Sequence, residues 1–409
     1  MTAPTARQPA DDLSDPLVSV IIPARNCETD LREALSWLSH THGVRYELIV
    51  VDDASTDGTA RAAEEMGAEV VRLETNVGPA EARNAGAAVA RGEYLVFIDA
   101  DVGVKPDTLG RILQTFWDAP WAAAVFGSYD LSPAAGNVLS QYRNLLHHFV
   151  HQTSREEAAT FWAGCGAVRA DVFRQVGGFD ASFDRPSIED IAFGVRLRQA
   201  GYRIRLNKAI QVTHFKRWTL RNILKTDIWY RGVPWTRLIL AQSHMPNDLN
   251  LKWTQRLSVV LTYALLATAL VGAWLVPGLL LLPIALVAGV IAIDYWSNRQ
   301  RIPTVVRVFG VIAAGGSVGL LTALFHVWAL VPLTILAAIV VLNHWLYRFF
   351  AHERYFLFAV FVIPMHVLYF AYCGFAFALG VAFHFRDGLQ AADASAPPVK
   401  RMSRTTATR

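Results

Sequence analysis

Three long stretches of this sequence carry no Asp, Glu, Lys or Arg, and they lie at residues 257–293, 308–343 and 356–381. Uncharged apolar runs of roughly 18 residues or more are typical of membrane-spanning helices. A buried core helix is usually shorter and shows a polar stripe. Pro277-Gly278 and Pro332 offer breaks for helical hairpins in the first two stretches. The sequence therefore predicts an integral membrane protein with its membrane region at 257–385.

Five apolar segments can be drawn in this region, at about 257–276, 279–294, 305–325, 327–346 and 356–381. Basic residues cluster at 299–307, at 348–354 and in the tail 386–409. Positively charged loops prefer the cytoplasm. Five spans with a cytoplasmic amino-terminal part would leave the basic tail outside. Two topologies therefore stay open. One has four spans, with 305–325 re-entrant or interfacial, and the other has five spans and an external tail.

The rest of the composition narrows the class of protein. A length of 409 residues leaves room for two or three domains, and a net charge of +4 gives no electrostatic argument for nucleic acid. Residues 1–16 are polar and lack an apolar core, so we expect a flexible tail and not a secretory signal. The three cysteines are scattered and fit neither a disulfide framework nor a zinc site, as expected of a soluble part that faces a reducing cytosol.

Residues 216–256, just before the first apolar stretch, mix tryptophan with lysine and arginine. Trp218, Trp229, Trp235 and Trp253 lie among nearby basic side chains. This mixture suits the headgroup layer of a membrane. A nucleic-acid patch would look similar, but the neighbouring membrane region favours lipid. We expect amphipathic interfacial helices here.

Residues 17–100 alternate short apolar runs with helical patterns. The pattern predicts strands at 17–23, 46–53, 68–74 and 94–98, with helices at 29–40, 56–66 and 78–90 between them. Strand–helix–strand repetition at this spacing predicts an α/β fold, a parallel sheet covered by helices on both faces. Ligands of such sheets bind at the carboxyl ends of the strands.

Polar side chains follow these predicted strands at the point where each one ends. Asp52-Asp53 close the second strand, and Asp99-Ala100-Asp101 close the fourth. Side chains at i and i+2 of an extended chain share a face, so Asp99 and Asp101 are expected to converge. Two carboxylates this close repel each other, and a divalent cation relieves the repulsion. A polar strand end that caps the next helix is the alternative from these residues alone.

Residues 104–215 are mixed. A strand is expected at 121–130 and a helix at 137–151, which carries His147, His148 and His151. No carboxylate or cysteine accompanies these histidines at a known ligand spacing, so we favour a packed helix over a metal site. Residues 187–206 predict a helix followed by a strand, with Ser187 as the helix cap and Asp190 three residues on, as in a capping box.

Several motifs resemble glycosyltransferase family 2 over residues 17–218 and follow the order that this family has. They read VSVIIPARN, LIVVDDASTDGT, NVGPAEARNAGAAVARGEYLVFIDADV and GGFD followed by IEDIAFGVRLRQAGYRI. The resemblance implies the GT-A fold, with a Rossmann-like, mostly parallel sheet at 17–215, and inverting transfer from a nucleotide-diphosphate sugar. The apolar helices would follow this domain.

The resemblance also implies roles for single residues. Pro23, Ala24 and Asp53 would line the base pocket, Arg83 would approach the diphosphate, and Asp99 would face the ribose or share the metal. Asp101 would bind Mg²⁺ or Mn²⁺. Asp190 would be the catalytic base, with Glu189 beside it. From the residues alone a capping or salt-bridging Asp190 is the favoured interpretation, since Arg196 and Arg198 follow closely, and the resemblance shifts the preference to catalysis.

One departure from the family pattern concerns the segment after the base. Membrane polysaccharide synthases of this family carry Gln-Xaa-Xaa-Arg-Trp there, and this chain reads His214-Phe215-Lys216-Arg217-Trp218. Arg217 and Trp218 match, and would lie in the acceptor or diphosphate region. His214 replaces the glutamine and either completes the metal sphere or packs in the core. The replacement weakens the case for a processive synthase.

The sequence therefore predicts a glycosyltransferase that moves a sugar to a lipid or polyprenyl-phosphate acceptor at the membrane surface. We expect the plasma (inner) membrane, with the catalytic domain in the cytoplasm. The alternatives are a processive polysaccharide synthase and a transporter with a nucleotide-binding regulatory domain. A nucleotidyltransferase would ordinarily show a Gly-rich, lysine-containing loop after the first strand, and PARNCETD has none.

Overall fold

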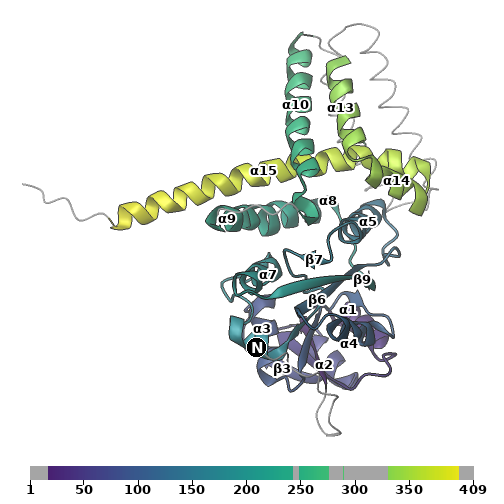
Figure 1. Cartoon of the computed structure of the whole chain (residues 1–409), viewed down its shortest axis with the longest axis vertical. Coiled ribbons are helices and arrows are strands. Elements are labelled where there is room, and N and C mark those ends of the chain that lie inside the picture. The colour runs from purple at the N-terminus through teal and green to yellow at the C-terminus, as the bar shows by residue number, and fades with distance from the viewer. Residues whose placement is uncertain (1–16, 243–247, 276–288, 290–329, 396–409) are drawn as a thin grey trace, which may run out of the picture.

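The computed structural model describes residues 17–242, 248–275, 289 and 330–395. It shows an α/β domain joined to a group of long apolar helices (Figure 1). Several predicted segments lie wholly or nearly outside the described residues. They are the amino-terminal tail, the apolar segments at 279–294 and 305–325, and the last part of the basic tail.

The first half of the sheet is parallel, as predicted. Its strands are β1 (Val18–Ala24), β2 (Tyr46–Asp53), β3 (Glu69–Leu73) and β4 (Tyr94–Ile98). They lie in the order β3-β2-β1-β4. The connecting helices are α1 (Glu28–Leu38), α2 (Thr59–Glu65) and α3 (Pro79–Val89). The order reverses at β1, between β2 and β4, which is where open α/β sheets form their ligand crevice.

Both faces of this sheet are buried under helices. Alternate residues of one strand enter different cores, so that Val20 and Ile22 of β1 join one cluster and Ile21 joins the other. The first cluster includes Leu31 and Leu35 of α1. The second takes small alanines from α3 and aromatic rings from beyond it. Strands covered on both faces read as near-continuous apolar runs, which is the pattern that the sequence showed.

The second half of the domain makes the sheet mixed. Its strands are β5 (Val102–Gly103), β6 (Ala122–Tyr129), β7 (Glu157–Ala158), β8 (Cys165–Arg169) and β9 (Arg203–His214). Its helices are α4 (Thr108–Asp118), α5 (Val138–Gln152), α6 (Ala170–Val176) and α7 (Glu189–Gln199). Strand β8 runs antiparallel to both β4 and β6, while β6 and β9 are parallel. The observed α/β sheet agrees with the predicted fold class.

The start of α7 differs from the sequence prediction. The helix begins at Glu189 with Ile188 as its N-cap, and no side chain caps it. Ser187 instead donates its hydroxyl to the carbonyl oxygen of Tyr230 at 2.6 Å. The predicted capping box of Ser187 and Asp190 is therefore wrong. A tertiary partner from another segment takes the hydroxyl, which a local motif cannot reveal.

The carboxyl-terminal part is helical. After α8 (Leu220–Lys225) come the π-helix η1 (Thr226–Gly232), α9 (Val233–Gln242), the short η2 (Leu249–Leu251), α10 (Trp253–Leu275), α13 (Leu330–Leu342), α14 (His344–Glu353) and α15 (Phe356–Ser395). Within the described residues, Trp253–Val271 and Phe356–Asp387 are long and apolar enough to cross a membrane. Helices α13 and α14 form a pair bent by 68°, which could make a third crossing. The predicted boundaries at 216, 257 and 385 stay predictions.

A third core joins the α/β domain to these helices. Tyr142 and Leu145 of α5 pack with Phe350 of α14 and Val362 of α15. Arg354, at the end of α14, donates to the carbonyl oxygen of Leu131 at 2.7 Å. Figure 1 shows α5 at this junction, above the sheet and below α14 and α15. The α/β domain and the apolar helices thus share one packed helix.

We predict that Phe97→Ala destabilises the protein by about 3–5 kcal/mol, because it leaves a cavity in a closed aromatic core. Phe97 is fully buried, and its ring centroid lies 5.0 Å from that of Phe179. Denaturant unfolding of the full chain, followed by circular dichroism, measures the loss. Trp117→Ala is the control, since this side chain is exposed. Equal losses for the two variants would contradict the assignment of the core.

Candidate functional site

A cavity of about 660 Å³ opens at the carboxyl ends of β1, β2 and β4. It continues past β6 and α5 to η1, α9 and α15. Its lining contains these residues predicted from the sequence: Pro23, Ala24, Asp53, Arg83, Asp99, Asp101, Glu189, Asp190, His214 and Trp218. Arg217 was predicted too but does not line it. The fold therefore gathers side chains separated by almost 200 residues.

Asp53, at the end of β2, holds the wall of the cavity. Its buried carboxylate accepts the backbone N–H of Val77 at 2.7 Å and of Gly78 at 3.0 Å. Gly78 has φ 87°, and a Cβ there would meet the backbone carbon of Asp184 at 2.4 Å. Asp53 thus fixes a turn that only glycine fits. Its predicted contact with a nucleobase stays a prediction.

Arg83, on α3, lies between two carboxylates. Its Nη1 donates to Oε1 of Glu189 at 2.9 Å, and its Nη2 donates to Oδ1 of Asp99 at 2.7 Å. Burial alone would lower the pKa of this guanidinium, but the charges of Asp99 and Glu189 outweigh burial and raise the pKa above its usual range. Both terminal nitrogens are engaged, so Arg83 joins the end of β4 to the start of α7. An approach to a diphosphate, as the family resemblance implies, would require one of these bonds to open.

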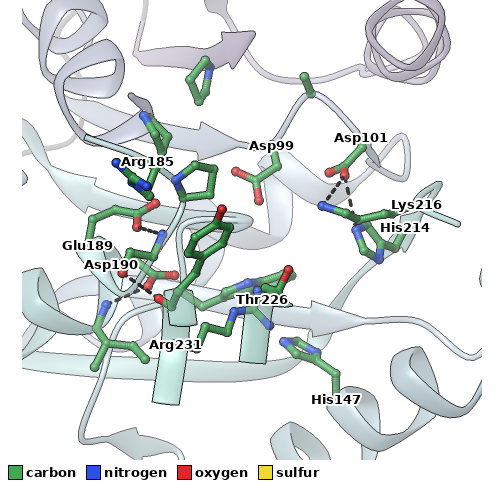
Figure 2. Close-up of a pocket in the computed structure, with 18 of the residues that line it drawn as sticks. Asp99, Asp101, His147, Arg185, Glu189, Asp190, His214, Lys216, Thr226 and Arg231 are labelled. Atoms are coloured by element: carbon green, nitrogen blue, oxygen red, sulfur yellow. Dashed lines mark hydrogen bonds and ion pairs between the residues drawn. The ribbon is translucent and has the colours of Figure 1, made fainter. Parts of the chain in front are cut away.

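Asp99 and Asp101 both face the cavity, but not through strand alternation. Strand β4 ends at Ile98, and the next residues form a turn closed by the Val102 N–H to the Asp99 carbonyl oxygen at 3.1 Å. Figure 2 shows Asp99 and Asp101 at separate positions, with Asp101 directed to His214 and Lys216. The expected convergence of the two carboxylates on one point by strand geometry is therefore wrong. Each has its own basic neighbours.

Asp101 faces His214, the last residue of β9. Nε2 of His214 lies 3.5 Å and Nζ of Lys216 lies 3.8 Å from Oδ2 of Asp101. The imidazole stacks on Tyr129 with ring centroids 4.4 Å apart and 12° between planes, which fixes its orientation. Burial would raise the pKa of Asp101, but His214 and Lys216 outweigh burial and lower the pKa to about 2. Asp101 is thus a carboxylate at any ordinary pH.

Asp101 and His214 are two of the residues that the sequence predicts to hold a divalent cation. A carboxylate oxygen and an imidazole nitrogen face each other across one edge of the cavity, and of the two the carboxylate is the ligand type that Mg²⁺ and Mn²⁺ prefer. Among the described residues, no group of three His, Cys, Asp or Glu side chains gathers closely enough to hold a metal ion.

Asp190, in the first turn of α7, is partly buried and lines the cavity. Its Oδ1 accepts the N–H of Ile191 at 2.8 Å, and its Oδ2 accepts the N–H of Ala163 at 3.2 Å. Burial, and then the neighbouring charge of Glu189, raise the pKa of Asp190 to about 7. A carboxylate with a pKa near neutrality can take up a proton during a reaction.

The cavity also contains residues that the sequence reasoning did not select. Tyr129, Trp162 and His147 form an aromatic wall, with the His147 and His151 rings 4.0 Å apart. Arg231 of η1 lies further along. The four-residue spacing of Arg143, His147 and His151 places them on one helical face, and that spacing was the available signal. Nothing in the sequence indicates that this face meets the cavity.

Comparisons with known proteins agree on one family. Residues 19–177 match the model described as "Glycosyl transferase family 2". The chain is 31% identical over 226 residues to a pre-mycofactocin glycosyltransferase from Mycobacterium tuberculosis, which covers 53% of this chain and 46% of that protein. It is 41% identical over 106 residues to a 4,4'-diaponeurosporenoate glycosyltransferase from Staphylococcus haemolyticus, which covers 24% of this chain and 28% of that protein.

The matched regions are partial. The chain spans about half the length of the first relatives that it matches. Among solved structures, a mannosyltransferase from Pyrobaculum calidifontis in complex with GDP-Man and Mn²⁺ aligns over 92% of this chain and 88% of that chain, at 17% identity and a TM-score of 0.44.

We predict that Asp53→Ala weakens binding of a nucleoside diphosphate by about tenfold or more, because the turn at Val77-Gly78 loses two hydrogen bonds to a charged acceptor. Calorimetric titration with UDP and with GDP measures the affinity. Glu74→Ala is the control, since this carboxylate is exposed near the same turn. Unchanged affinity in Asp53→Ala would remove this residue from the nucleotide site.

Proposed function

We propose, from the premise that residues 19–177 belong to glycosyl transferase family 2, that this protein is an inverting membrane glycosyltransferase. It transfers a sugar from a nucleotide-diphosphate sugar to a lipid-borne acceptor. The observation that carries the proposal is one continuous cavity. It joins the Asp101–His214 pair to Asp190 and then to Trp235 and Tyr369 of the apolar-side helices.

The donor binds across the carboxyl ends of β1, β2 and β4. Pro23 and Ala24 of β1 and the turn held by Asp53 line the part of the cavity suited to the nucleoside. Asp101 and His214 would hold the divalent cation, which supplies positive charge to a leaving diphosphate. Lys216, whose Nζ lies 3.8 Å from Asp101, adds a further cation at the same edge.

The acceptor is activated from a different wall. An acceptor hydroxyl that reaches Asp190 loses its proton to that carboxylate as its oxygen bonds to the anomeric carbon. The bond from that carbon to the diphosphate oxygen breaks at the same time, and the electron pair leaves with the nucleoside diphosphate. Asp190 and the Asp101–His214 pair belong to separate elements, α7 against the β4 turn and β9, so attack and departure can occur on opposite faces of the sugar. That geometry gives inversion.

Membrane attachment explains the acceptor class. Tyr369 belongs to α15, one of the two described helices apolar and long enough to cross a membrane. The cavity therefore reaches the region where the head group of a lipid would lie. With the family's cytoplasmic donors, the α/β domain would face the cytoplasm at the plasma membrane.

The test is a screen of the purified full chain with UDP- and GDP-sugars plus Mn²⁺, in which nucleotide release is followed with and without extracted membrane lipid. We expect lipid-dependent release. Asp101→Ala and Asp190→Asn should each lower it by about 100-fold or more, since one removes charge at the leaving group and the other removes the base. Glu74→Gln is the exposed-carboxylate control. Full activity in Asp190→Asn would refute the base assignment.

The raised pKa of Asp190 predicts the pH dependence of kcat/KM. The base works only when deprotonated, so kcat/KM should fall about tenfold per pH unit below a pKa of about 7. Glu189→Gln removes the neighbouring negative charge that raises this pKa, so its acid limb should move to lower pH. A pH–rate profile of the two proteins measures the shift. A limb that stays in place, or moves upward, would contradict the assigned cause.

A further inference from the structure

The end of the cavity nearest the apolar helices has its own lining, which includes Tyr230, Arg231, Trp235 and Tyr369. We call it the membrane-side end. It is formed mainly by η1, α9 and α15, and none of its members belongs to the donor-site residues discussed above. The question is what this end binds.

Arg231 brings a positive charge here that its neighbours do not balance. Among the described residues its ion-pair partner is Asp227, with 3.9 Å between Nη1 and Oδ1. That carboxylate already pairs with the Arg143 guanidinium through Oδ1 and accepts the Tyr372 hydroxyl at 2.7 Å through Oδ2. Two arginines therefore share one aspartate, and about one positive charge is left over. Figure 2 shows Arg231 among the residues that line the cavity.

The backbone at Arg231 is positioned by the packing of η1 on α15. It lies on η1, and π-helical turns occur frequently at functional sites. At the next residue, Gly232, a Cβ would come within 2.6 Å of the Cβ of Ala376. The glycine therefore lets η1 pack directly on α15, which holds Arg231 next to an apolar helix.

A second polar group of the same cavity lacks a partner. Nδ1 of His147, a cavity-lining residue of α5, is buried with no hydrogen-bond partner in the described structure. Burial, and then the charges of His151 and Arg231, lower the pKa of His147 well below its usual value, so the ring is neutral. A neutral imidazole and an arginine are both able to donate to an anionic oxygen.

We infer that the acceptor is a lipid-linked phosphodiester that also carries a hydroxyl, with the phosphate bound by Arg231 beside His147 and the hydroxyl presented to Asp190. Arginine suits this task because its planar donors match phosphate oxygens. The inference rests on the proposed function and deepens it by naming the acceptor class.

Two simpler acceptors each leave one feature without a role. A neutral lipid alcohol gives Asp190 a proton to take but gives Arg231 no anion. A polyprenyl monophosphate gives Arg231 its anion, but its second phosphate pKa is about 6, so at neutral pH it attacks as a dianion and brings Asp190 no proton. In the inferred reaction the phosphodiester is unchanged. Its hydroxyl oxygen bonds to the anomeric carbon, its proton goes to Asp190, and the nucleoside diphosphate leaves.

The experiment uses the full chain in phosphatidylcholine nanodiscs with a radiolabelled donor sugar. Extracted membrane lipid is separated by anion exchange into neutral, phosphodiester and phosphomonoester fractions, and each is added in turn. We expect transfer to the phosphodiester fraction, giving a product whose sugar resists mild acid, as a glycoside does and a sugar phosphate does not. Arg231→Gln should raise the acceptor KM by about 10- to 100-fold, with a much smaller change in the donor KM.

Arg221→Gln is the matched control, because Arg221 is an exposed arginine of α8 outside the cavity lining. Its acceptor KM should stay at the wild-type value. Transfer to the neutral fraction, an acid-labile product from the monoester fraction, or an unchanged acceptor KM in Arg231→Gln would each overturn the inference while leaving the proposed function intact. Absence of transfer to every fraction would overturn the proposed function as well.

Discussion

The buried contact of Arg83 with Asp99 and Glu189 is the interaction on which the site depends. Arg83 of α3 binds Asp99, which follows β4 and is 16 residues away along the chain. It also binds Glu189 of α7, which is 106 residues away. Removing one member of such a buried charged group leaves another charge unpaired, which is strongly destabilising. Glu189 also accepts the Ser187 N–H at 2.8 Å. The contact therefore sets where the neighbouring Asp190 stands relative to the end of β4.

The sequence was sufficient for the parts of the structure that depend on local pattern. The apolar runs that form β1 to β4 have the period and spacing of a parallel sheet, and the strand ends predicted that Asp53, Asp99 and Asp101 lie at the same edge of it, where they line one cavity. The partners of these residues could not be predicted in the same way. Arg83 contacts Glu189, and Asp101 contacts His214, and the residues of each pair are more than 100 positions apart in the sequence. The hydroxyl of Ser187 donates to the carbonyl oxygen of Tyr230 and does not cap its own helix.

In the proposed reaction, the charges along the cavity follow the direction in which the sugar would be transferred. The donor end combines Asp101 with His214 and Lys216, a group suited to a cation and a diphosphate. The middle contains Asp190, whose pKa is raised by burial. The membrane-side end has the excess charge of Arg231. Each region thus suits a different part of a two-substrate reaction, and the apolar helices supply the last of them.

Helix α5 belongs to both halves of the molecule. One side of it lines the cavity with Arg143 and His147, while Tyr142 and Leu145 pack against α14 and α15. The apolar helices therefore do more than attach the α/β domain, because they also complete its core and its cavity. Cutting the chain after residue 215, or joining that part to a foreign anchor, would remove the cavity wall that η1, α9 and α15 provide and would expose the apolar side of α5 to water.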